Sequence, residues 1–135
     1  MNTARKARMK RIGRDNKRVE AAQNQRGRED LAPRLRDIVA PLQTLRLRFK
    51  DARENGEQAG LSYAKPIVVA NAPAHFEVCC MDKACNGRHD ITEPLMEALR
   101  ARQAKCAGRS KCAGTVNDLP CEHTLVYEAD ATYSR

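Results

Sequence analysis

The apolar positions between residues 30 and 54 follow a helical pattern. Steps of four and three residues alternate along one stripe, formed by Leu31, Leu35, Ile38, Leu42, Leu45 and Phe49. Asp30 is suited to cap the start of such a helix, and Asn55-Gly56 is suited to end it. Pro41 removes one backbone hydrogen bond inside it. The pattern therefore predicts an amphipathic helical segment over 30–54 that is kinked near Pro41.

Two stretches in the second half of the chain alternate between apolar and polar positions, as half-buried strands do. They cover residues 75–80 and 121–133. The alternation places Cys80 and Cys121 on the apolar sides of their strands. Cys79 falls on the opposite side, so we expect it to point away from the core.

A helix is predicted between these strands, from about Glu93 to Lys105, with Pro94 in its first turn. Residues 55–65 contain Gly and Ser and predict a linker. The expected fold class is α+β. We expect a small zinc-stapled domain over 66–135, similar to a zinc ribbon or zinc knuckle, with antiparallel strands and one helix.

The net charge of the chain belongs to its first 28 residues. This stretch holds ten basic side chains against Asp15 and Glu20, which equals the +8 of the whole chain. The basic residues are Arg5, Lys6, Arg8, Lys10, Arg11, Arg14, Lys17, Arg18, Arg26 and Arg28. Residues 29–135 carry fifteen basic and fifteen acidic side chains and are formally neutral. A segment so charged and so poor in apolar groups predicts a basic flexible tail over 1–28, or a solvated helix, when it is free.

Two roles fit this tail, and a third is disfavoured. Lys and Arg neutralise phosphates without reading bases, which favours a nucleic-acid-binding arm. The tail could also serve solubility alone. A membrane-surface helix is disfavoured because the tail lacks a broad face of large apolar side chains.

All six cysteines lie within 43 residues, from Cys79 to Cys121. The chain has no stretch that resembles a secretion signal, so this density favours metal binding over disulfides. Two separated pairs that close on one ion are typical of zinc sites that tie distant segments together. Spacing and strand alternation predict four ligands of one structural Zn²⁺: Cys80, Cys85, Cys112 and Cys121. Only 4% of the chain is aromatic, so a metal site would supply stability that the core lacks.

Four further side chains are candidate metal ligands: His89, His123, Cys106 and Cys79. His89 could replace a thiolate of the first site, and together the four could form a second one. The alternation argument speaks against two of them, so we expect one site rather than two.

No enzyme motif is present. The chain lacks a Gly-rich phosphate loop, a nucleophile elbow and a His-Glu-x-x-His zinc motif. Four thiolates would also leave zinc without an open coordination position. We therefore expect a protein that is not an enzyme.

Two functions remain. The first is a non-catalytic zinc protein that associates with nucleic acid, RNA or DNA, or with a nucleoprotein assembly, through its Arg-rich tail. The second is a protein–protein adaptor or assembly subunit, in which the apolar stripe over 31–49 provides the contact and the tail binds an acidic partner. Its contact residues would be Leu35, Ile38, Leu42 and Leu45. The charge asymmetry favours the first function. No membrane span is expected, and the expected location is the cytoplasm.

Overall fold

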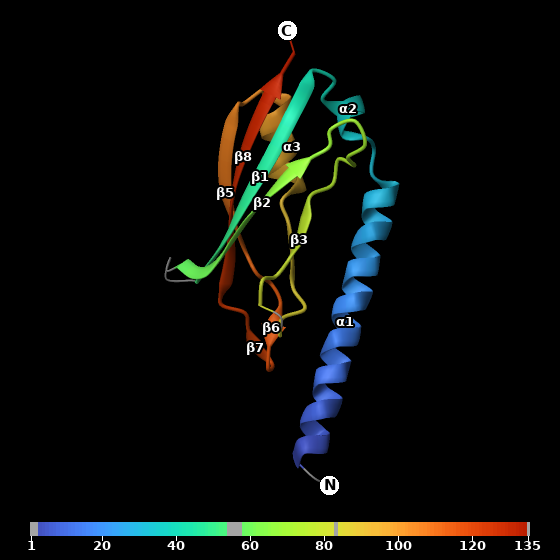
Figure 1. The fold of residues 1–135 in the computed structure, drawn as a ribbon, viewed down its shortest axis with the longest axis vertical. Coiled ribbons are helices and arrows are strands. Elements are labelled where there is room, and N and C mark those ends of the chain that lie inside the picture. Colours follow the sequence, from blue (N-terminus) through green and yellow to red (C-terminus); the bar gives the residue numbers. More distant parts are fainter. Residues whose placement is uncertain (1–2, 54–57, 83, 135) are drawn as a thin grey trace.

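A long helix, α1, runs along one side of the molecule (Figure 1). The computed structural model describes residues 3–53, 58–82 and 84–134, with residues 3–16, 53 and 58–61 described by their backbone alone. Helix α1 spans Thr3–Leu31 and is rich in Ala, Arg, Lys, Gln and Glu, which favour helices. It ends two residues before Pro33. The segment predicted to be a flexible tail or a solvated helix is therefore helical from Thr3 onward.

The segment after α1 differs from the sequence prediction. A single helical turn, α2, covers Leu35–Ile38, and strand β1 covers Leu42–Arg53. The predicted helical segment over 30–54 is therefore wrong beyond Ile38. The predicted linker over 55–65 is also wrong where it overlaps strand β2, which spans Gln58–Ile67. Its residues 55–57 lie outside the described part of the chain.

Strands β1 and β2 join two later strands in one antiparallel sheet of order β2-β1-β8-β5. Strand β5 spans Lys105–Lys111 and β8 spans His123–Tyr133. The sheet thus crosses the domain boundary predicted at residue 66. The prediction of an α+β protein with antiparallel strands is confirmed.

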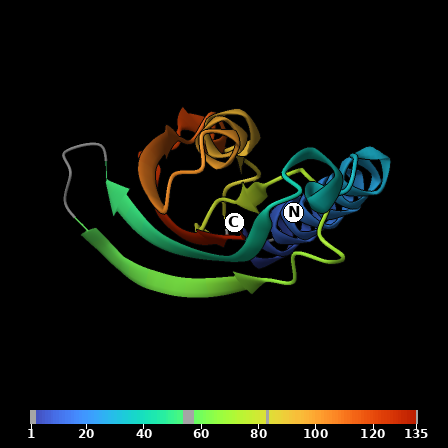
Figure 2. The ribbon, with the colours of Figure 1, turned by 90° about the horizontal axis from the view of Figure 1, so that it is seen from above.

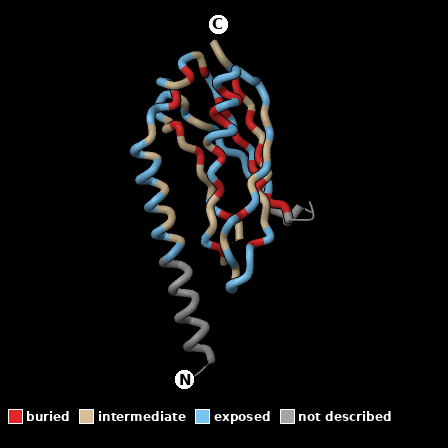
Figure 3. The backbone as a smooth tube through the Cα atoms, turned by 180° about the vertical axis from the view of Figure 1, so that it is seen from behind, coloured by how far each residue is buried: buried red, intermediate tan, exposed pale blue. Residues whose placement is uncertain are grey.

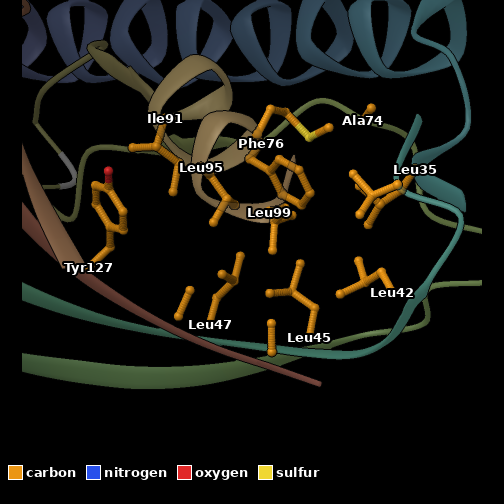
Figure 4. Packing of buried hydrophobic residues seen from close by; sticks show 14 of the residues in the cluster. Leu35, Leu42, Leu45, Leu47, Ala74, Phe76, Ile91, Leu95, Leu99 and Tyr127 are labelled. Atoms are coloured by element: carbon orange, nitrogen blue, oxygen red, sulfur yellow. The ribbon is translucent and has the colours of Figure 1, made fainter. Parts of the chain in front are cut away.

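Helix α3, Thr92–Arg100, lies in the concave side of the curved sheet (Figure 2). It is shorter than the predicted 93–105 helix because the chain enters β5 at Lys105. Figure 4 shows side chains of α3 and Phe76 meeting those of the sheet. The main apolar cluster consists of Leu35, Val39, Leu42, Leu45, Leu47, Phe49, Ala74, Phe76, Ile91, Leu95, Met96, Leu99, Leu125, Tyr127, Ala129 and Ala131.

Two short hairpins complete the fold. Strand β3, Glu77–Cys79, pairs with β4, Arg88–Asp90. Strand β6, Thr115–Val116, pairs with β7, Leu119–Pro120. The β6–β7 turn consists of Asn117 and Asp118, both with positive φ (52° and 66°), which residues of these types tolerate best after glycine.

Burial differs between the sheet with α3 and helix α1. Figure 3 shows buried positions along the sheet and α3, whereas the described side chains of α1 are exposed or intermediate. Among the described residues, no helix is long and apolar enough to span a membrane.

Candidate metal centre

Four cysteines from two loop regions come together beside hairpin β6–β7. Cys80 and Cys85 lie in the loop between β3 and β4, Cys112 follows β5, and Cys121 precedes β8. All four are buried, with exposed fractions of 5% or less. Their sulfur atoms all lie within 4.8 Å of one another. The structure therefore brings together the four residues that the sequence predicts as ligands.

The sulfur separations suit a tetrahedral ion. The Sγ atoms of Cys80 and Cys121 are 3.7 Å apart, and those of Cys85 and Cys112 are 3.5 Å apart. Four sulfurs that each lie about 2.3 Å from a tetrahedral zinc are about 3.8 Å from one another. A disulfide would need about 2.05 Å, so the cysteines are arranged around a centre rather than bonded in pairs.

The two cysteine loops are built alike. In each, a glycine follows a cysteine after one intervening residue and donates its N–H to that cysteine's sulfur: Gly87 to Cys85 at 3.3 Å, and Gly114 to Cys112 at 3.4 Å. The carbonyl groups of the same glycines accept the backbone N–H groups of Cys80 and Cys121, both at 3.0 Å. N–H groups aimed at sulfur stabilise the thiolate form that binds metal.

The two glycines also pack against each other's loop. A Cβ atom on Gly87 would collide with Sγ of Cys112, and a Cβ atom on Gly114 would lie 2.6 Å from Sγ of Cys85. It would also lie 2.7 Å from the backbone of Gly87. The absence of a side chain at these positions therefore allows the two loops to approach until their sulfurs meet.

The site favours a bound cation. Burial raises the pKa of the Cys80 thiol, and the nearby thiolate charges of Cys112 and Cys85 raise it further. Several thiolates can be buried side by side only if a positive ion compensates their charge. Four sulfur donors in a closed tetrahedron fit a soft or borderline metal ion. The donor set therefore fits the metal that the sequence predicts.

Helix α1 contacts the first cysteine loop directly. Nη1 of Arg18 donates to the carbonyl oxygens of Asp82 and Cys85, at 3.2 and 2.6 Å. The guanidinium group thereby satisfies two loop carbonyls and adds positive charge beside the four cysteines. Arg18 was predicted only as one basic residue of the tail, and nothing in the sequence indicated this contact.

The remaining candidate cysteines lie outside the cluster. Cys79, at the end of β3, is exposed, whereas Cys80 is buried, as the strand alternation predicts. Cys106 is partly buried in β5, and burial raises the pKa of its thiol. Neither belongs to the group of four sulfurs that lie within ligand range of one another.

The candidate histidines His89 and His123 lie beside a hydroxyl and a carboxylate group, respectively, rather than beside cysteine sulfurs. Nδ1 of His89 lies 3.1 Å from Oγ of Ser110, and Nδ1 of His123 lies 2.8 Å from the carboxylate of the buried Asp51. Burial lowers the pKa of His89 and favours its neutral ring. Among the described residues, His89 and His123 therefore form no second ligand group with the two remaining cysteines.

A second group of metal-binding side chains consists of His75, Glu77 and Asp90. Its central carboxylate is already neutralised, because Arg28 and Arg88 donate to the Glu77 oxygens at 2.6 to 3.0 Å. The Asp90 side chain accepts a backbone N–H at the start of α3. Two guanidinium charges oppose the approach of a cation, so this group acts as an ion-pair cluster.

Sequence reasoning did not assign roles to Gly87 and Gly114. A signal was present, since both loops contain the pattern Cys-x-Gly, at Cys85-Asn86-Gly87 and Cys112-Ala113-Gly114. Comparison with known proteins adds no further constraint: no protein family, curated protein or solved structure matches the chain.

Proposed function

We propose that this chain is a non-catalytic zinc protein that associates with nucleic acid or a nucleoprotein assembly through its basic N-terminal helix. The buried cluster of four cysteines would hold one structural Zn²⁺. Sulfur separations of 3.5 and 3.7 Å support zinc as the ion. Two similar loops that contribute two ligands each also support a site resembling a zinc ribbon or a pair of zinc knuckles.

A structural role follows from the donor set. With four thiolate ligands the ion has no open position for a water molecule or a substrate, which a catalytic zinc requires. The chemistry that zinc supplies here is cross-linking of two chain segments that are about 30 residues apart in sequence.

Metal analysis tests the zinc proposal. Purified protein should contain one zinc per chain, and the cobalt-substituted protein should show the absorption of a tetrahedral thiolate site. Cys112→Ser should lose the metal, whereas Cys79→Ser should retain it because Cys79 is exposed and lies outside the cluster. Equal zinc content in the two variants would contradict the four-ligand assignment.

The nucleic-acid proposal is carried by the position of the charge. Residues 1–28 hold the entire +8 of the chain, and α1 arranges them along one continuous helix. Its described basic side chains Lys17 and Arg26 are exposed, whereas Arg28 is paired with Glu77. A helix of this kind presents cations to phosphates with little sequence preference.

The adaptor alternative loses the surface it requires. Leu35, Leu42 and Leu45 are at most 5% exposed because they pack in the apolar core. Ile38 is partly buried against the same core, and Leu31 is the one exposed residue of the predicted stripe, so the stripe over 31–49 offers a partner protein no continuous apolar surface.

Salt-dependent binding tests the helix. A helix that contacts about eight phosphates predicts a slope of log affinity against log salt of about −7 for a duplex and about −6 for a single strand. The full-length triple variant Arg8→Gln, Arg11→Gln, Arg14→Gln should reduce the steepness by about 2 to 3. The matched control removes three exposed arginines elsewhere: Arg36→Gln, Arg100→Gln, Arg102→Gln. A slope that is the same in both variants would refute the helix as the binding arm.

A further inference from the structure

The sheet has an outer face that no described helix covers. Figure 2 shows α3 on the concave side and α1 beside the sheet, while the convex side is open. Between residues 44 and 50 of β1, the inward positions Leu45, Leu47 and Phe49 alternate with outward positions that are all exposed. The outward residues of β2, β8 and β5 follow from the antiparallel pairing.

This outer face is strongly basic. Its cationic residues come from β1 and β5: Arg46, Arg48, Lys50, Lys105, Arg109 and Lys111. Its acidic residues are Glu128 and Asp130 on β8, and Arg48 contacts both, at 3.0 Å each. Counted over the residues whose side chains are described, the face carries a net charge of +4, although residues 29–135 as a whole are neutral. Folding thus brings basic side chains together on one surface, and the neutral composition of residues 29–135 does not indicate this.

The basic residues form two rows. One row lies on β1 from Arg46 to Lys50, and the other lies on β5 from Lys105 to Lys111, with β8 between them. Neighbouring strands are about 4.8 Å apart, so the rows are separated by about 10 Å. At about 3.3 Å per residue the rows are about 13 and 20 Å long. Duplex DNA carries one negative charge per about 1.7 Å of its axis, so a surface of this length faces several phosphates at once.

Among the described residues, no aromatic side chain lies on this face, because Phe49, Tyr63 and Tyr127 occupy inward positions. Single-stranded nucleic acids are bound largely by stacking their bases on aromatic side chains. A basic face without such groups suits a duplex, which already displays its phosphates outward. We propose that the outer face of the sheet is a second nucleic-acid contact, which binds the phosphate backbone of a duplex. The proposal rests on the association with nucleic acid inferred above and adds a surface that is independent of α1.

The test compares full-length variants in fluorescence anisotropy, with a 20-base-pair DNA duplex and one of its single strands as probes, across a salt series. The sheet-face variant is Arg46→Gln, Lys50→Gln, Arg109→Gln. It should bind the duplex about 100- to 1,000-fold more weakly at 0.1 M salt, because its slope should be less steep by about 2 to 3. The control variant Arg36→Gln, Arg100→Gln, Arg102→Gln removes the same charge and should behave as the unmodified protein.

A gain of binding separates this effect from loss of fold. The double variant Glu128→Gln, Asp130→Gln removes the negative charge of the face and releases Arg48, so it should bind the duplex more tightly with a slope steeper by about 1. Loss of fold would not produce tighter binding. If duplex binding is unchanged in both sheet-face variants, the proposal is overturned.

The helix variant distinguishes the two surfaces. If Arg8→Gln, Arg11→Gln, Arg14→Gln weakens binding and the sheet-face variant does not, α1 is the contact and the second surface is refuted. If only the sheet-face variant weakens binding, the proposed role of α1 is wrong and the sheet stands. Equal loss for the duplex and the single strand would overturn the assignment to a duplex, and absence of binding to both probes would overturn both proposals.

Discussion

The distance between the two cysteine loops is set by two residues that have no side chain. Gly87 and Gly114 each occupy the space in which a methyl group would meet the opposite loop's cysteine sulfur. An added methyl group at either glycine would also meet the backbone of the other glycine, which cannot move aside as a flexible side chain could. Relief of a clash here requires the loops to separate, and this would pull the sulfurs out of tetrahedral range.

We therefore predict that Gly87→Ala and Gly114→Ala each weaken zinc binding by about tenfold or more, similar to other changes around metal ligands. Competition with a chromophoric chelator measures the effect. Gly27→Ala is the matched control, because nothing lies within 4 Å of its added Cβ. It should stabilise α1 by about 0.5–1 kcal/mol and leave zinc binding unchanged. Equal zinc affinity in all three variants would show that the loops tolerate the methyl group.

The cluster of four cysteines was predictable because the signals for it are local in the sequence. Cysteine density indicated metal, spacing gave two pairs, and strand alternation separated Cys80 from Cys79. The glycine contacts were not predictable in the same way, since each glycine touches a loop about 27 residues away. Only the folded arrangement shows why an alanine would not fit.

At the scale of elements, β1 shows how two periodicities can coexist in one segment. Leu42, Leu45 and Phe49 match a helical stripe, while Leu45, Leu47 and Phe49 match the two-residue alternation of a strand. Helix α2 ends at Ile38 and β1 starts directly after Pro41, so the helix does not continue past this proline. Pairing with β2 on one side and β8 on the other then satisfies the backbone of β1. Those partners are distant in sequence, so the local pattern alone did not decide between the two structures.

Leu47 distinguishes the two structures experimentally. In a helix it would lie off the apolar stripe, whereas in β1 it is 2% exposed. We predict that Leu47→Ala lowers the free energy of unfolding by about 2–5 kcal/mol, as truncation of a buried leucine does. Urea denaturation measures it. The outward neighbour Arg46→Ala should change the free energy of unfolding by about 0.5 kcal/mol or less. A small effect of Leu47→Ala would contradict the strand.

The docking of α1 depends on a buried carboxylate in β3. The Glu77 side chain is 4% exposed and accepts hydrogen bonds from Arg28, Arg88 and His75. Its backbone carbonyl also accepts a hydrogen bond from the Gln25 side chain at 2.8 Å. The hydrogen bond from Arg28, helped by His75 and Arg88, lowers the pKa of Glu77 from 4.5 to about 2.

A carboxyl group with a lowered pKa stabilises the fold above its ordinary pKa, and this contribution is lost as the pH falls from 4.5 to about 2. We predict that Glu77→Gln at pH 7 increases amide hydrogen exchange of the α1 residues 17–31 by about tenfold or more, equivalent to about 1.4 kcal/mol. Exchange in β1 and β8 should stay unchanged. An NMR titration of the Glu77 carboxyl carbon should give a pKa well below 4.5. The exposed Glu97→Gln is the control, and the same exchange pattern in both variants would show that Glu77 does not hold α1.

At the scale of the whole molecule, stability comes from two separate clusters. The main apolar cluster joins α2, α3 and the sheet, whereas the four cysteines form a second buried cluster against which Val116 packs. Among the described residues, Val116 is the one apolar side chain that packs against the four cysteines, so bonds to a metal ion would supply most of the cohesion of this cluster. Helix α1 contacts both regions, through Arg18 at the cysteine loop and Arg28 at β3.

Metal removal should therefore unfold part of the molecule rather than all of it. We predict that chelation at neutral pH raises hydrogen exchange in the segments that hold the cysteines, residues 80–87 and 112–121. Exchange should also rise around Arg18, whose carbonyl partners belong to the first of these segments. Amides of β1 and β8 should stay protected, because their side chains pack in the apolar cluster. Exchange followed by mass spectrometry with and without a chelator measures this, and re-addition of zinc should restore protection. Uniform loss of protection would mean that the sheet cannot fold without metal, and no loss would mean that the thiols hold the loops together without an ion.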